Sequence, residues 1–151
     1  MFLKRLFLLI LFFSGIIVPQ LFSQTIPTRM DIPNWVKMGM TLFEARNYAP
    51  NGLLLPRGEN QYFYSLNGDI HILVIDPNKG LTSFQLAIDY NVNSAIEIFT
   101  NEYGNPLKEG DNFFYWNINN SAKNLNFVSI TIHNNNFSHL NIIYYFSNLF
   151  Y

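Results

Sequence analysis

The chain has 151 residues, with 9 basic and 10 acidic side chains and no cysteine. Without cysteine, neither a disulfide nor a lipidated N-terminal cysteine is possible, and without a basic run nucleic acid is not an expected partner. Aromatic residues make up 17% of the chain and charged residues only 13%, which is enough apolar material for one domain with a core of its own.

The first residues, 1–23, are typical of a secretory signal peptide. A basic start precedes an apolar run, Leu6–Val18, and a small residue, Ser23, stands at the expected cleavage site. Cleavage there leaves residues 24–151 as a single exported domain, in the periplasm or outside the cell. The alternative is an uncleaved membrane anchor, but the apolar run is shorter than the ~20 residues that span a bilayer.

The first predicted helix begins at a capping box. Thr41 and Glu44 have the spacing at which a hydroxyl and a carboxylate bond to the first backbone amides of a helix. Pro50 then ends this helix after about two turns. A separate helical turn is expected earlier, at residues 33–38, with Trp35 packed inward.

The next stretch, GENQYFYSLN at residues 58–67, places bulky side chains on alternate positions. This is the period of a β-strand with one face toward a core, and we place Tyr62 and Tyr64 on that face. A hairpin follows, in which residues 70–76 and 81–90 flank a turn at residues 78–80. With a three-residue loop, the inward side chains of this hairpin are Ile72, Val74, Phe84, Leu86, Ile88 and Tyr90.

A second helix is expected after this hairpin. Asn93 is placed as its N-cap, and Gly104 followed by Pro106 marks its end. Its apolar stripe consists of Val92, Ala95, Ile96, Phe99 and Tyr103.

The chain then repeats itself. The stretch GDNFFYWNIN at residues 110–119 matches residues 58–67, and a second hairpin follows, with strands 125–133 and 137–146 around a loop at 134–136. The loop again has three residues, so the faces can be assigned in the same way. The inward side chains of this second copy are Phe114, Trp116, Val128, Ile130, Ile132, Leu140, Ile142 and Tyr144.

These patterns predict an α+β fold made of two tandem α-β-β-β units, at residues 41–90 and 92–146. Neither unit can bury its sheet face alone, so we expect one antiparallel sheet with the helices packed on one face. The stretches GMTLFE at 39–44 and YGNP at 103–106 resemble motifs of SmpA/OmlA-type periplasmic domains and of β-lactamase inhibitor proteins. The resemblance covers residues 38–146 and implies that protein partners bind the other face of the sheet.

The sheet face away from the helices is predicted to be apolar and exposed, which is typical of a partner-binding surface. Two alternatives remain open. Residues 25–40 or 147–151 cover this face, or the protein is a carrier that holds a lipid or another apolar ligand between sheet and helices. We expect a non-catalytic domain that binds a protein or peptide through Phe63, Leu73, Ile75, Phe113, Tyr115, Ile143 and Tyr145.

No catalytic or cofactor site is predicted. The sequence contains no Ser-His-Asp spacing, no phosphate-binding glycine loop and no cysteine nucleophile. His133 and His139 are the one pair that neighbouring strands would bring together as metal ligands, but no third ligand is evident in the sequence. We therefore interpret them as ordinary polar residues, and His71 as a strand residue rather than a base.

Overall fold

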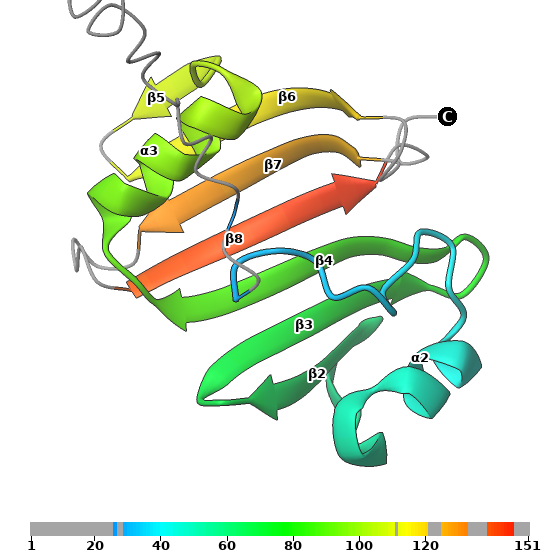
Figure 1. Ribbon diagram of the computed structural model, residues 1–151. Coiled ribbons are helices and arrows are strands. Elements are labelled where there is room, and N and C mark those ends of the chain that lie inside the picture. The colour runs from blue at the N-terminus through cyan, green and yellow to red at the C-terminus, as the bar shows by residue number, and fades with distance from the viewer. Residues whose placement is uncertain (1–25, 27–28, 111, 121–124, 133–138, 147–151) are drawn as a thin grey trace, which may run out of the picture.

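The computed structural model describes residue 26 and residues 29–110, 112–120, 125–132 and 139–146. In this part of the chain, eight strands form one antiparallel sheet and two α-helices lie against it (Figure 1), which confirms the predicted α+β class. The elements are α2 (Leu42–Tyr48), the 3-10 helix η1 (Pro50–Gly52), β1 (Leu55–Gly58), β2 (Gln61–Leu66), β3 (Asp69–Asp76), β4 (Gly80–Asp89), α3 (Val92–Tyr103), β5 (Lys108–Gly110), β6 (Phe113–Asn120), β7 (Leu125–Ile132) and β8 (His139–Phe146).

The strands lie in the order β1-β2-β3-β4-β8-β7-β6-β5. Each half of the chain therefore begins at one edge of the sheet and ends in the middle, where β4 pairs with β8 and Gln85 lies opposite Ile143. The prediction of three strands in each half is wrong, because the short edge strands β1 and β5 add a fourth. Gly58 ends β1, and Asn60, with a φ of 60°, lies in the turn into β2.

The core lies between the sheet and the helices. The predicted inward residues that are buried there are Phe84, Leu86, Ile88, Val128, Ile130, Leu140, Ile142 and Tyr144, while Tyr90 is only partly buried. On β6, Trp116 is fully buried, and its Nε1 donates a hydrogen bond of 2.7 Å to the carbonyl of Gly104 at the end of α3. Phe99 of α3 packs against the same indole, with ring centroids 5.6 Å apart. The helix is thus fixed to the sheet by both packing and a hydrogen bond.

The two helices begin at different kinds of cap. At α2, the Thr41 hydroxyl accepts from the Glu44 amide while the Glu44 carboxylate accepts from the Thr41 amide, as predicted. At α3, the cap is Asn91 rather than the predicted Asn93, because the Asn91 side chain accepts from the amide of Ser94 at 3.0 Å. The helix therefore begins at Val92, and its fully buried positions are Val92, Ala95, Ile98 and Phe99.

The hairpin between β3 and β4 differs from the prediction by one residue. Asp76 pairs with Gly80 around a loop of residues 77–79, and Gly80 takes the left-handed φ of 75°. A β-bulge follows, because Ile75 pairs with Leu81 but Val74 pairs with Ser83, which leaves Thr82 as the extra residue on β4. The Thr82 Oγ1 donates to the Val74 carbonyl at 3.1 Å. The shift reverses the expected faces of β3, since an odd displacement exchanges the two sides of a strand.

The N-terminal segment Arg29–Met40 lies on the helix side of the sheet, where Figure 1 shows it crossing in front of the central strands. Met30 is fully buried, and the Tyr144 hydroxyl donates to its carbonyl. Trp35 packs at 5.7 Å from Tyr64, but in a turn rather than the expected helical turn. The predicted alternative in which this segment covers the opposite face is therefore wrong for residues 29–40.

The second hairpin keeps the predicted inward face with a different pairing. A three-residue loop at 134–136 would place Thr131 opposite His139, but in the structure Thr131 lies opposite Asn141. This displacement of two residues leaves both faces of the strands unchanged. The connection itself, residues 133–138, lies outside the described residues, and so do the predicted signal peptide at 1–23 and the tail at 147–151. No helix in the described part of the chain is long and apolar enough to cross a membrane.

Candidate partner-binding face

The outer face is defined as the side of the sheet away from α2, α3 and residues 29–40. Along the six inner strands, its side chains alternate with those of the core. Its most accessible large apolar side chains are Leu55, Ile70 and Phe113, at 49%, 40% and 37%; Ile72 is buried and the others are half-buried. Its described apolar members are Leu55, Phe63, Ile70, Ile72, Val74, Ala87, Phe113, Tyr115, Ile143 and Tyr145.

The structure brings together most of the residues that were predicted for this surface. Two of the predicted residues do not belong to it: Leu73 and Ile75 are buried in the core, on the opposite side of the sheet. The cause is the bulge at Thr82, which pairs Leu73 with Phe84 and Ile75 with Leu81. The predicted residues that do lie on the outer face are Phe63, Phe113, Tyr115, Ile143 and Tyr145.

Sequence reasoning missed the β3 residues that replace them. Ile70, Ile72 and Val74 lie on the outer face, although Ile72 and Val74 were predicted to point inward. The whole of β3 is apolar apart from its ends and His71, so hydrophobic alternation gave no indication of its faces. The signal that could have found them is the Asn67-Gly68 pair, which is typical of a two-residue hairpin. Both residues have positive φ and Leu66 pairs with Asp69, which fixes the register of β3 against β2.

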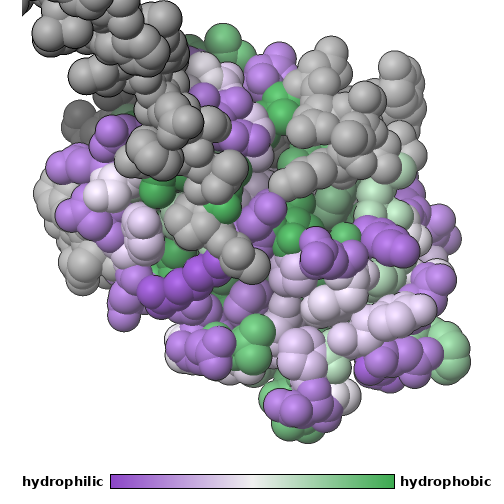
Figure 2. Space-filling model, in the orientation of Figure 1, coloured by the Kyte–Doolittle hydropathy of each residue, from purple (hydrophilic) through white to green (hydrophobic). Residues whose placement is uncertain are grey.

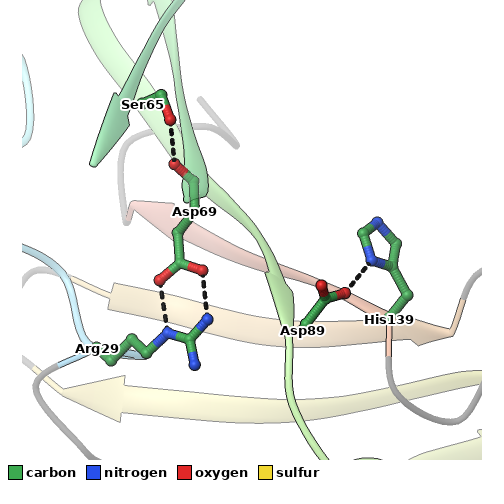
Figure 3. A network of polar contacts seen from close by, with 5 residues as sticks. All are labelled: Arg29, Ser65, Asp69, Asp89 and His139. Carbon is green, nitrogen blue, oxygen red and sulfur yellow. Dashed lines mark hydrogen bonds and ion pairs between the residues drawn. The ribbon is translucent and has the colours of Figure 1, made fainter. Parts of the chain in front are cut away.

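On the two middle strands, β4 and β8, the charged side chains of the outer face lie at one end. Asp89 and His139 pair across β4 and β8, with Asp89 Oδ1 2.6 Å from His139 Nδ1 (Figure 3). Both side chains are largely exposed, so this pair contributes little to stability. Towards the middle of the sheet, Gln85 and Asn141 are the half-buried polar side chains on the same two strands.

A second polar cluster lies on the helix side of the sheet. Arg29 binds both oxygens of Asp69 at 2.6 Å, and the Ser65 hydroxyl donates to the Asp69 carbonyl (Figure 3). The next inward residue, His71, stacks on Tyr64 at 4.5 Å. Desolvation lowers the pKa of His71, against a smaller opposing effect of Asp69, and burial raises the pKa of Tyr64.

This cluster does not have the geometry of an active site. His71 Nδ1 and the Tyr64 hydroxyl have no hydrogen-bond partner, yet both side chains are almost completely buried. A general base must reach the proton that it removes, and no substrate can reach these atoms. Within the described residues, no group of three potential metal ligands occurs, and His133 of the suggested pair is not among them.

The helix side also exposes apolar side chains, but in a different arrangement. Phe43 and Tyr48 of α2 are 76% and 61% exposed, and this exposure was not predicted. Among the residues coloured in Figure 2, hydrophobic ones lie in separate patches between polar ones.

Two pockets of about 320 and 400 Å³ adjoin Gly39, and polar as well as apolar residues line them. Neither forms the large apolar cavity that a lipid carrier needs.

Comparisons with protein-family models, with curated proteins and with solved structures found no match to the chain. A function must therefore be inferred from the chemistry of the surface itself.

Proposed function

We propose that this chain is an exported, non-catalytic domain that binds a protein or peptide through the outer face. The observation that carries the proposal is the composition of that face. It presents apolar and aromatic side chains across six strands, the charged side chains of its two middle strands lie at one end, and residues 29–40 pack on the other side. A contiguous apolar surface of this kind is typical of an interaction site.

Aromatic side chains are the expected anchors of the interaction. Phe113 and Tyr115 are neighbours on the outer side of β6, with ring centroids 6.0 Å apart. Tyrosine and phenylalanine contribute large contact areas with few rotatable bonds, and such residues dominate the energy of many interfaces. The two rings are therefore the best place to weaken binding without disturbing the core.

The experiment is affinity capture from the exported fraction, with the chain as bait. The double variant Phe113→Ala/Tyr115→Ala is expected to recover at least about tenfold less partner, while its melting temperature falls by no more than about 5 °C. The matched control is Phe43→Ala/Tyr48→Ala, which removes two exposed rings from α2 on the other side of the sheet. Equal capture by both double variants, or unfolding caused by the first, would contradict the proposal.

We also infer that the two halves of the chain are diverged copies of one unit, a helix followed by four antiparallel strands, related to the periplasmic domains named above. The palindromic strand order supports this inference, and so does the equivalence of Tyr64 on β2 with Trp116 on β6. The capping box at Thr41 and the positive φ of Gly104 support the resemblance. An experimental structure whose halves do not superimpose would refute the duplication.

A further inference from the structure

We propose that the outer face binds a second copy of this chain, so that two sheets pack face to face in a twofold dimer. This inference rests on the proposed function and names the partner. In a twofold interface the same surface is used on both subunits, so it must be complementary to itself. The chemistry, the charge distribution and the size of the outer face all meet this requirement.

The accessible polar side chains of the outer face are self-complementary. Amides and hydroxyls carry both a hydrogen-bond donor and an acceptor. By contrast, an ionised carboxylate only accepts, and the cationic groups of lysine and arginine only donate. An amide can therefore bond to the same amide of another copy. The half-buried or exposed uncharged polar residues on the inner strands of this face are Gln61, Ser65, Gln85, Asn117, Thr131 and Asn141.

The centre of the face is free of described charge. β4 and β8 are the two middle strands, and Gln85 pairs with Ile143 near the middle of their ladder. A side chain close to a twofold axis meets its own copy, so a charged residue there would repel itself. The Asp89–His139 pair lies at the end of these strands, away from that point.

The size of the face fits a stable dimer. Six inner strands at ~4.8 Å spacing are about 29 Å wide, and strands of about eight residues are about 26 Å long. The planar area of the face is therefore about 750 Å², of the same order as the ~800 Å² of accessible surface that each partner buries in a standard interface. Two sheets also pack face to face at a favourable distance of ~10 Å when their inner side chains interdigitate.

The edges of the sheet are poor sites for a partner strand. β1 contains Pro56, which has no amide hydrogen to donate, and β5 has only three residues. Pairing through the edges is therefore disfavoured, which favours association through a broad face of the sheet.

The test is the oligomeric state of the full chain, expressed with its own N-terminal residues and measured by sedimentation equilibrium from about 1 to 100 μM. We expect a monomer–dimer equilibrium in this range. Gln85→Glu adds a charge near the axis at almost constant shape, and we expect it to weaken dimerisation at least about tenfold. Asn93→Glu adds the same charge on the exposed side of α3 and should leave the equilibrium unchanged.

A mixing experiment makes the test specific. Gln85→Glu and Gln85→Lys should each be monomeric alone, and an equimolar mixture should recover dimers because opposite charges then meet at the axis. Dimers in the mixture would support the face-to-face arrangement. A wild-type monomer at all concentrations, or a dimer that Gln85→Glu does not weaken, would overturn it.

Two further outcomes would identify a different occupant and also overturn the inference. If the wild-type chain is a monomer and deletion of residues 147–151 creates a dimer sensitive to Gln85→Glu, the tail occupies the face. If it is a monomer whose capture of another protein still depends on Phe113 and Tyr115, a different partner occupies it. In that last case the inference fails while the proposed function stands.

Discussion

At the scale of single residues, the position of one glycine decides which side of β3 enters the core. Gly80 adopts a left-handed φ of 75° directly after the loop, and the bulge at Thr82 follows. The backbone of residues 39 and 40 passes close by, where the Gly39 amide donates to the Leu81 carbonyl and the Leu81 amide to the Met40 carbonyl. Only glycine satisfies both the backbone angle and the close approach.

Gly80→Ala is expected to destabilise the protein by at least about 3 kcal/mol, from left-handed strain and overpacking together. A β-carbon at this position would lie 2.1 Å from the carbonyl oxygen of Gly39. Gly68→Ala is the matched control, because Gly68 has a φ of 88° but nothing within 4 Å of a β-carbon. It should cost only about 1 kcal/mol. Urea denaturation measures both, and equal losses would show that the close approach is unimportant.

At the scale of elements, the two helices depend on the sheet to different degrees. α2 has seven residues and buries only Ala45, whereas α3 has twelve residues and buries four. Short helices are marginal without packing, so the capping box contributes a larger share of the stability of α2. In α3, Phe99 packs against both Trp116 and Tyr144 of the sheet.

The cap of α3 gives a prediction that separates two neighbouring asparagines. Asn91→Ala removes the side-chain oxygen that accepts from the Ser94 amide and should cost about 1 kcal/mol. Asn93→Ala changes an exposed position inside the first turn, where alanine has the higher helix propensity, so stability should be unchanged or slightly increased. Thermal unfolding of both variants tests this order. A larger loss for Asn93→Ala would move the cap to that residue.

At the scale of the whole molecule, the N-terminal segment Arg29–Met40 closes the core between the two helices. Met30, Val36 and Met40 are buried in the same cluster as the sheet, and Arg29 joins the segment to Asp69 at the start of β3. Residues 29–40 therefore cover the helix side of the sheet and not the outer face.

Arg29→Ala should destabilise the fold by about 2 kcal/mol, because Asp69 is left buried without its counter-charge. The value lies below that of a fully buried pair, since the Arg29 side chain is half-exposed and solvent screens the interaction. Adding Asp69→Asn should recover much of the loss, because a neutral amide costs less to bury. A double-mutant cycle by chemical denaturation measures the coupling. Additive losses would mean that the ion pair contributes nothing.

Much of the outer face was predictable, and the part that was not has a clear origin. The alternation of His139, Leu140 and Asn141 at the start of β8 distinguishes its two faces, and continuing that period correctly placed Ile143 and Tyr145 on the outer one. The same reasoning failed for Leu73 and Ile75, which lie in a continuous apolar run. In such a run either face can be buried, so only the pairing with β4 decides.

The sequence by itself determined both helix regions, the first capping box and the six longer strands, since these depend on residues near one another in the chain. The tertiary structure alone decided the bulge at Thr82, the pairing of β4 with β8 and the side on which residues 29–40 pack. These features depend on contacts between distant segments, such as the fit of Gly80 against Gly39, and no local pattern encodes them.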